Sequence, residues 1–409
     1  MQKRIRIVSV GIVLVILLIG IIVMNNNSNN KYSFTQDGIK YALTLDGNEV
    51  TSFPSKGMYK AQVTCVGADG RWLYDDWKLA IENITSDDVT CDIKFETIPK
   101  TYLNDYIISL SGKTQGTGQV VNENGYRYEG KNPNNYIWFN NEYWRIIGVF
   151  DSASHGVSGK NLVKIIRAES LDGLAWHKSN TNDWTASSFK LLLNGAYYNA
   201  QDGTSSGYCY GYSTTATANC DYTKKGIQSG YRGMIANVTW HLGGYSSTSA
   251  TSSAFYGYER GTTVYSGRPT STTGYIGLMY PSDYGYSVLS SSCTRTTNLG
   301  SYGSATCAGQ SWLYGKGYEW TLTPISSDSN KVFYLYSYGY VRNNPAYEGY
   351  GSRPVLYLDA SVYKIDGDGS LNNPYIVRMW WICLAWMAGV SAPRGGDNFW
   401  LSKSSGEFL

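Results

Sequence analysis

The sequence predicts an α+β protein in three parts: an N-terminal transmembrane helix, a small all-β sandwich-like domain, and a larger domain that mixes helices and strands. Three observations lead to this fold class. A long apolar run opens the chain, period-two alternation of apolar and polar residues follows, and two helical patterns then occur among short strand-like runs. The 409 residues are enough for two domains and an anchor, since a domain usually takes roughly 100 to 200 residues.

The composition favours an extracellular protein with an uncharged polar surface. Tyr (37) and Gly (45) are far above ordinary usage, while charged residues make up only 16% of the chain. The 34 Lys and Arg nearly balance the 31 Asp and Glu, so the overall charge implies neither a nucleic-acid partner nor a strongly acidic substrate.

Residues 1–24 predict an uncleaved signal anchor. Basic residues stand before the apolar run of residues 7–24, which is interrupted only by Ser9 and two glycines. The run is just long enough to span a bilayer, and no small-residue cleavage site follows, which favours an anchor over a removed signal peptide. The positive-inside rule keeps the basic residues in the cytoplasm. It therefore predicts a single-pass protein of the cell membrane whose C-terminal region is extracellular. Residues 25–31 form a polar linker.

Residues 32–97 predict the small β domain, with an immunoglobulin-like sandwich as its form. Strands are expected at Tyr41–Leu45, Met58–Val66, Trp77–Ile84 and Val89–Phe95. In the second and the last of these, Cys65 and Cys91 fall on the apolar face of an alternating strand. A disulfide between them follows from this placement and from the oxidising location; two buried free thiols are the alternative.

Residues 98–114 predict a linking helix, because apolar residues recur at helical spacing after Pro99. The larger domain follows at residues 115–377. Its first elements are a hairpin over 136–150 with an Asn-Asn-Glu turn, a strand at 161–167, and a helix that starts at Asp183-Trp184. A second helix around 227–235 is weaker, since Gly230 and Gly233 both lower helix stability.

The cysteines of the larger domain predict two more disulfides. Cys209 and Cys220 bracket one irregular stretch, and Cys293 and Cys307 bracket another. Closing loops of this length stabilises the fold by roughly 3 kcal/mol each when the effect is ascribed to chain entropy. The seventh cysteine, Cys383, lies in a tail of unknown role at residues 378–409, which is rich in tryptophan.

The stretch from Trp312 to Leu358 predicts a recognition surface. Two strand-like runs, 332–336 and 354–358, flank a segment that has almost nothing to bury. Tyr, Gly, Ser and Asn are the residue types that binding loops favour, because a tyrosine ring offers much contact area for few rotatable bonds. A well-solvated hairpin loop is the alternative. The predicted ligand-binding residues are Tyr338, Tyr340, Asn343, Asn344, Tyr347, Glu348 and Tyr350.

The same stretch resembles the ending of a bacterial surface domain of unknown function. The matching elements are Trp320–Pro324 (W-x-L-x-P) and Ser352–Leu356 (S-R-P-V-L), with further likeness at 136–151, 239–244 and 277–285. The fold of that family is similar to the C-type lectin fold. It belongs to the branch of that fold shared with formylglycine-generating enzymes and the variable proteins of retroelements. The resemblance covers residues 115–377 and implies a lectin-like fold there.

The resemblance also implies that residues 337–352 vary. In the retroelement target proteins, substitution at adenine-rich asparagine codons yields mostly Tyr, Ser, Gly, Asp and Asn, which are the types that crowd this loop. Ordinary drift between paralogues is the alternative, because the whole chain is rich in these residues. Trp320 and Arg353 are predicted to be structural, since an arginine that opens an apolar strand is partly buried and must find a carboxylate or carbonyls.

The sequence predicts no catalytic set, no metal site and no cofactor. The histidines, His155, His177 and His241, lie far apart and in no metal-ligand spacing. Formylglycine-generating enzymes use a cysteine pair, but the cysteines before Val377 are assigned to disulfides. A hydrolytic pair stays open among the acidic residues Glu142, Glu169, Asp183, Glu259 and Asp283.

These features favour a membrane-anchored adhesion protein that displays a lectin-like domain for an extracellular protein or glycan ligand. A cell-surface glycan or cell-wall hydrolase is the second hypothesis. A structural component of a surface layer, whose loops bind nothing in particular, is the third; broad exposure of the tyrosines without a cluster would favour it.

Overall fold

Strands dominate this protein, which corrects the predicted α+β class. The computed structural model describes residues 6–8, 34–36, 38–55, 57, 59–74, 77–216, 219–303, 305–315 and 317–379. Strands make up 40% of the structure and helices 14%, and the sheets are curled. The described helices are short because the segments predicted to hold them are rich in Gly, Ser and Tyr, which are weaker helix formers than Ala or Leu.

The two predicted helices of the larger domain show this shortening. The segment that begins at Asp183 is divided into a 3₁₀ turn, η1 (Trp184–Ala186), the short α3 (Ser188–Leu192) and a π-type turn, η2 (Leu193–Tyr197). The segment predicted over 227–235 keeps only α4 (Ser229–Arg232), which ends at Gly233.

The predicted N-terminal transmembrane helix is also overturned. Residues Arg6–Val8 form a strand, β1, that pairs antiparallel with β7 (Lys78–Glu82). Isoleucine and valine suit a strand as well as an apolar helix, so an apolar run does not by itself decide between the two. The rest of the predicted span, residues 9–24, lies outside the described residues. Across the described part of the chain, no helix is long and apolar enough to cross a membrane.

The small β domain consists of two sheets around one core. The first has the order β2-β3-β8-β5 with β4 beside β3, and the second has the order β1-β7-β6. The remaining bounds are β2 (Phe34–Gln36), β3 (Ile39–Leu45), β4 (Asn48–Val50), β5 (Tyr59–Val66), β6 (Asp69–Leu73) and β8 (Val89–Thr97). Alternate residues of β8 are buried, and Trp72, Trp77 and Phe95 pack edge-on or tilted in the core.

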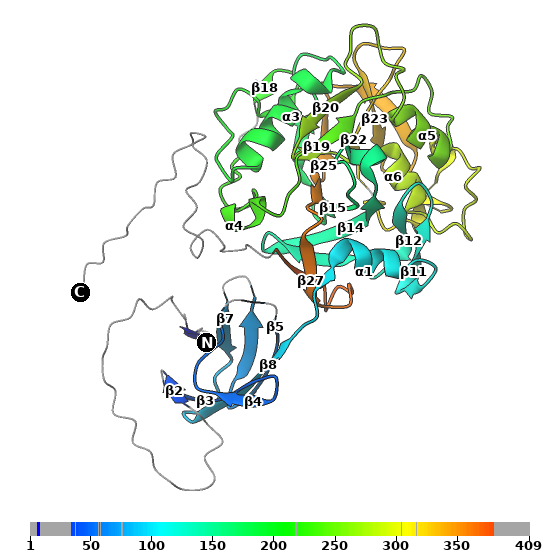
Figure 1. Ribbon diagram of the computed structural model, residues 1–409. Helices are drawn as coiled ribbons and strands as arrows, with labels where there is room; N and C mark the ends of the chain where they lie inside the picture. Colours follow the sequence, from blue (N-terminus) through cyan, green and yellow to red (C-terminus); the bar gives the residue numbers. More distant parts are fainter. Residues whose placement is uncertain are drawn as a thin grey trace, which may run out of the picture. The chain divides into compact units, whose positions relative to one another are not determined.

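The larger domain is built on an 11-stranded sheet, whose strands run from cyan to orange in Figure 1. Its main order is β10-β11-β12-β14-β13-β28-β27-β9; β15 joins β14 to β26, and β26 pairs with β21. The bounds are β9 (Thr101–Tyr102), β10 (Thr114–Gln115), β11 (Thr117–Asn122), β12 (Tyr126–Asn132), β13 (Tyr136–Phe139), β14 (Glu142–Phe150), β15 (Leu162–Arg167), β21 (Ile276–Gly277), β26 (Val355–Leu358), β27 (Val362–Asp366) and β28 (Tyr375–Met379).

Local sequence explains the first elements of this domain. The linking helix is α1 (Leu103–Ser109), which buries Leu103 and Ile107. The predicted hairpin is β13–β14, and its turn residues Asn140 and Asn141 both have positive φ, 58° and 60°. Asparagine tolerates this left-handed conformation better than most residues, so the residue types at these two positions predict the turn.

A second sheet of five strands, ordered β16-β25-β22-β23-β24, carries the segment that was predicted to bind ligand. Its bounds are β16 (Leu171–Ala175), β22 (Glu319–Pro324), β23 (Lys331–Leu335), β24 (Val341–Pro345) and β25 (Gly349–Ser352). Two small hairpins lie outside both sheets, β17 (Tyr210–Tyr212) with β18 (Thr215–Ala216), and β19 (Val238–His241) with β20 (Ser271–Gly274). The other helical segments are α2 (Ser152–His155), α5 (Ser252–Glu259), α6 (Pro281–Tyr286), η3 (Leu299–Ser301) and η4 (Ala308–Gln310).

All three predicted disulfides are formed, which fits an extracellular or secreted protein. Cys65 and Cys91 are directly opposite each other on β5 and β8, so the period-two argument placed them correctly. Cys209–Cys220 and Cys293–Cys307 close irregular segments of the larger domain.

A buried ionic cluster ties the larger domain together. The Asp283 carboxylate, on α6, accepts from the Arg127 guanidinium of β12 at 3.0 Å and from the Lys164 ammonium of β15 at 2.5 Å. Glu259, at the end of α5, pairs with Arg260 and accepts from the backbone and side chain of Ser282. All of these carboxylates and the Lys164 ammonium are sealed from solvent, so the cluster joins two strands and two helices in the core.

Candidate ligand-binding site

One face of the five-stranded sheet carries a row of aromatic rings, here called the aromatic strip. Trp320 and Tyr334 are register partners on β22 and β23, so their side chains share a face. Tyr350 of β25 lies 4.6 Å from the Trp320 ring and 4.7 Å from the Tyr334 ring, centroid to centroid. The full strip is Tyr318, Trp320, Tyr334, Tyr336, Tyr338, Tyr340 and Tyr350.

The strip runs from a buried end to an exposed end. Trp320 is fully buried and donates its indole N–H to the Leu174 carbonyl, which fixes its ring. Tyr318 is 43% exposed, and Tyr338, at the turn between β23 and β24, is 59% exposed. Exposed aromatic rings that are backed by buried ones form a rigid surface on which a ligand can stack.

The turn that presents Tyr338 is tight and depends on a glycine. The backbone N–H of Tyr336 donates to the Tyr340 carbonyl, and that of Gly339 donates to the Tyr336 carbonyl. Gly339 has φ 94°, a conformation that side chains rarely adopt. Its carbonyl accepts from the buried Tyr284 hydroxyl at 2.8 Å, so the turn is held to the core.

A cavity of about 660 Å³ opens beside this turn. Tyr338 and Ser337 form one wall, Trp312 and Tyr314 contribute aromatic surface, and Lys131 of β12 adds a charged group. The other lining residues come from the segment around η4: Ala308, Gly309 and Ser311. The volume lies within the range of small-molecule binding sites, roughly 300–1,000 Å³.

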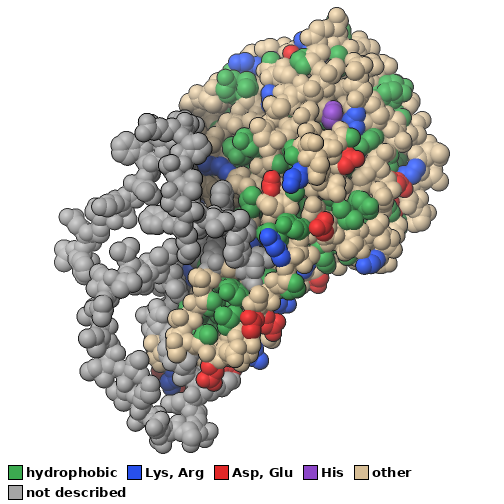
Figure 2. Space-filling model, in the orientation of Figure 1, with side chains coloured by type: hydrophobic (Ala, Val, Ile, Leu, Met, Phe, Trp, Pro, Cys, Tyr) green, Lys and Arg blue, Asp and Glu red, His purple; other side chains and the backbone are tan. Residues whose placement is uncertain are grey.

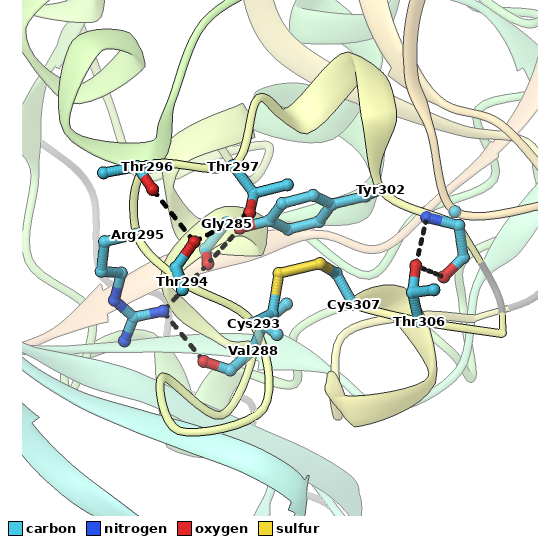
Figure 3. Close-up of a disulfide and its surroundings, with 12 residues drawn as sticks. Gly285, Val288, Cys293, Thr294, Arg295, Thr296, Thr297, Tyr302, Thr306 and Cys307 are labelled. Carbon is cyan, nitrogen blue, oxygen red and sulfur yellow. Dashed lines mark hydrogen bonds between the residues drawn. A yellow bond between two sulfur atoms is a disulfide. The ribbon is translucent and has the colours of Figure 1, made fainter.

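The wall from the η4 segment is stapled in place. Figure 3 shows the Cys293–Cys307 disulfide, with the Arg295 guanidinium directed at the carbonyls of Gly285 and Val288. Arg295 also pairs with Glu123 and with the buried Glu129. The segment therefore has no regular secondary structure for most of its length but has covalent and ionic anchors.

The residues predicted to bind ligand fall into separate groups. Tyr338 lines the cavity, and Tyr340 and Tyr350 belong to the aromatic strip. Asn344 donates to the Tyr350 hydroxyl and so supports the strip, whereas Asn343, the register partner of Phe333, is on the opposite face of the sheet.

Tyr347 and Glu348 lie at the other end of the hairpin from Tyr338. The Tyr347 ring packs edge-on against Tyr212 of β17 at 5.2 Å, and the Tyr347 carbonyl accepts from the Ser213 backbone N–H. The structure therefore does not bring these two residues to the cavity.

No family model, curated protein or solved structure matches the chain. The likeness to a lectin-like surface domain thus remains a prediction from the motifs.

Sequence reasoning missed the rest of the cavity. Trp312 and Tyr314 lie close together in the sequence just before β22, and this aromatic crowding was a signal that could have been used. Lys131 gave no such signal, because it reaches the cavity from β12, which is far away in the sequence.

Three phenols of the strip, those of Tyr334, Tyr336 and Tyr350, have raised pKa values and stay protonated at neutral pH. Burial raises the pKa of Tyr334 and Tyr350, and a hydrogen bond with Tyr318 raises that of Tyr336. Neutral phenols can both donate and accept hydrogen bonds. The Arg145 guanidinium lies 4.8 Å from the ring of the cavity residue Trp312 and donates to the Asn135 side chain. Burial lowers the pKa of this guanidinium to about 10.

The residues predicted to be structural have the partners that such a role requires. Arg353 is buried, and its guanidinium holds both oxygens of Glu319, at 2.7 and 2.8 Å, and the Leu313 carbonyl. Trp320 is the fully buried end of the strip. Both residues hold β22, the central strand beneath the site.

The candidate catalytic groups are not gathered in a cleft. Glu259 and Asp283 are neighbours, but both are fully buried and are held by the cations and hydrogen bonds of the ionic cluster. The other acidic candidates are Glu142, Glu169 and Asp183. Glu142 pairs with Arg167, and Asp183 caps η1. None of these residues lines the cavity beside Tyr338.

The histidines hold local structure. His155 and His241 contact the carbonyls of Phe150 and Ala153, respectively, and the His177 ring accepts from the Ser179 backbone N–H. Burial lowers the pKa of all three rings. Within the described ranges, no group of three or more His, Cys, Asp or Glu residues is placed to hold a metal ion.

Proposed function

We propose that this protein is an extracellular binding protein whose recognition surface is the exposed end of the aromatic strip together with the adjoining cavity. The observation that carries the proposal is the position of Tyr338, an exposed ring at the tip of a core-anchored turn and on the wall of a cavity of about 660 Å³. A preformed aromatic surface loses little conformational freedom on binding, which favours affinity.

The rest of the surface supports a binding role that does not depend on overall charge. In the view of Figure 2, charged side chains are scattered, and most of the surface is backbone or uncharged polar side chains. Most of the strip tyrosines are at least half-buried in one cluster, which is not the broad, dispersed exposure expected of a passive surface-layer component. Adhesion to an extracellular glycan or protein is the role that this surface fits.

Array binding tests the proposal. The full chain is applied to glycan and protein arrays and compared with Tyr338→Ala and Tyr318→Ala, each of which removes an exposed ring of the strip. Loss of a stacked aromatic residue should weaken binding by roughly tenfold or more. Tyr265→Ala is the matched control, since Tyr265 is a partly exposed tyrosine outside the strip. Equal binding by the wild type and the strip variants would remove this surface from the site.

A further inference from the structure

We propose that the cavity beside Tyr338 binds an anionic saccharide, with a pyranose ring against the aromatic side chains and its carboxylate at Lys131. The inference rests on the proposed function and names the chemical class of the ligand. Overall composition gave no hint of an acidic ligand, because the chain is nearly neutral. The reason for an anion is local.

The aromatic lining suits a sugar ring. Trp312, Tyr314 and Tyr338 bring three rings to one cavity. The faces of aromatic rings are electron-rich, and the axial C–H groups of a pyranose carry slight positive charge, so the two stack favourably. Trp312 is almost buried and donates its N–H to the Tyr128 carbonyl, so this ring is fixed before any ligand arrives.

Polar groups for sugar hydroxyls lie next to these rings. The Tyr314 hydroxyl donates to the Ser337 carbonyl at 2.6 Å, which leaves the phenol oxygen free to accept a hydrogen bond. Ser311 bonds Ser287 through its hydroxyl, and the backbone of Ala308 and Gly309 adds further polar atoms to the lining. A few oriented polar groups on an apolar lining are typical of small-molecule sites and fix the orientation of the ligand.

Lys131 supplies the charge selectivity. Of the described residues that line the cavity, Lys131 alone is charged, and it is exposed on β12. The nearest acidic residue along the strand, Glu129, is already committed: Arg295 and Gln119 both bond its carboxylate. The buried Arg145 guanidinium lies 4.8 Å from the Trp312 ring but does not line the cavity. An anion entering the cavity therefore meets the Lys131 ammonium without a competing free carboxylate from Glu129.

The shape favours a saccharide over a protein partner. A stable protein–protein interface buries roughly 1,200–2,000 Å² over two matched surfaces, whereas this site is an open pocket of the volume that small ligands use. One or a few sugar rings fit such a volume. Uronic acids and sialic acids both present a carboxylate on a pyranose ring, so both sources share the chemistry that this site would recognise.

Calorimetric titration of the full chain tests the proposal and separates the two sources. One arm compares trigalacturonic acid with the uncharged galactose trimer, and the other compares sialyllactose with lactose. In at least one arm the acidic sugar should bind roughly three- to tenfold more tightly, which is the gain expected from one charge-assisted hydrogen bond. The preference should shrink as salt is raised, because the lysine is exposed.

Variants show whether Lys131 causes the preference. Lys131→Met should bring the acidic sugar down to the affinity of its neutral counterpart and leave the neutral sugar unchanged, whereas Lys131→Arg should keep the preference. Lys225→Met, at an exposed lysine elsewhere in the domain, is the matched control. Tyr338→Ala should weaken both sugars.

Two outcomes would overturn the inference but leave the binding function intact. One is equal affinity for acidic and neutral sugars with no effect of Lys131→Met. The other is Tyr338-dependent binding of a protein or an acidic peptide, with no sugar bound. If Tyr338→Ala changes the binding of no ligand, the proposed function itself fails.

Discussion

The buried side chain of Arg353 joins three segments of the larger domain through its guanidinium. Its guanidinium makes a two-point contact with the Glu319 carboxylate and also reaches the Leu313 carbonyl, next to the cavity residue Trp312. A guanidinium has five donors in a fixed plane, so no other side chain reproduces this set of bonds. The pair links the start of β22 to the short connection between β25 and β26.

Arg353→Ala should destabilise the larger domain by about 3–5 kcal/mol, because it leaves the buried Glu319 carboxylate without its cation. Urea denaturation followed by tryptophan fluorescence measures the change. Lys331→Ala is the control, since its ion pair with Asp328 is partly exposed and should be worth less than about 1 kcal/mol. Equal stability of Arg353→Ala and the wild type would contradict the structural role.

Lys164 predicts a distinctive pH dependence. Burial lowers its pKa from 10.5 to about 8, and the ion pair with Asp283 offsets this only in part. Two arginines, Arg127 and Arg260, share the site and also disfavour the ammonium. Nearby cations lower the pKa of Asp283, so that carboxylate keeps its charge.

The sign follows from proton counting. Between pH 8 and about 10, the unfolded chain holds a proton on Lys164 that the folded protein has lost, so the contribution of Lys164 to the free energy of unfolding should rise with pH, by at most about 1.4 kcal/mol per unit. Buried tyrosines with raised pKa values, Tyr280 among them, oppose this rise increasingly above about pH 9, so the contribution of Lys164 is the difference in slope between the wild type and Lys164→Met. Urea titrations at pH 7.5, 8.5 and 9.5 measure the slope. Lys164→Met should flatten it and Lys225→Met should not; an unchanged slope in Lys164→Met would assign it to other groups.

At the scale of elements, the turn between β23 and β24 and the η4 segment both line the cavity. The turn is set by backbone geometry, and the η4 segment by a disulfide and by Arg295. Both walls are irregular, but each is anchored to the core, so the site should keep its shape in the absence of ligand.

Gly339→Ala should misplace Tyr338. A side chain at φ 94° costs about 1–2 kcal/mol in local strain, and the turn must shift to relieve it. Ligand affinity should therefore fall more than stability does, which thermal melts and binding titrations together can show. Gly317→Ala is a control with open space around the added methyl group. Unchanged affinity in Gly339→Ala would mean that the position of Tyr338 does not matter for binding.

Loss of the Cys293–Cys307 disulfide should loosen the other wall. Replacing both cysteines by serine should cost about 3 kcal/mol, as expected for closing a loop of this length. Affinity should fall with stability, because Ala308, Gly309 and Ser311 leave their places. Hydrogen exchange of residues 289–311 would detect the loosening, and exchange equal to that of the wild type would contradict it.

Local signals explain which elements the sequence could predict. The β13–β14 hairpin was predictable because its Asn-Asn turn and its strands agree, and the disulfide of the small domain because two alternating strands placed both cysteines on one face. The length of the helix predicted over 227–235 was not predictable in the same way, because its two glycines limit it to the single turn of α4. Loop composition singled out Tyr338, which lines the cavity, whereas Lys131 reaches the same cavity from a strand that is distant in the sequence, which no local pattern records.

At the scale of the molecule, the predicted small β domain and the predicted larger domain have separate hydrophobic cores within one compact unit. One core collects residues of β3 to β8, and the other collects those of the larger domain from Leu103 to Val377. Figure 1 shows the first group in blue and the second in cyan to orange. A domain with its own core can unfold as its own cooperative unit.

Calorimetry should therefore record two unfolding transitions. Replacing Cys65 and Cys91 by alanine should lower only the transition of the small domain, by about 3–4 kcal/mol in stability, and should leave the other unchanged. A single transition that moves as a whole would show that the domains unfold together.

The strand β28 has a consequence for how this chain is made. In the large sheet it lies between β13, which it joins in parallel, and β27, although it is the last strand that the structure describes. While a ribosome is still synthesising residues 136–370, the middle of that sheet lacks a partner, and the open edge of β13 is available to other chains. Such late, non-local pairing folds slowly. A chain that stops before residue 375 would therefore keep the edge of β13 unpaired, and such edges favour aggregation.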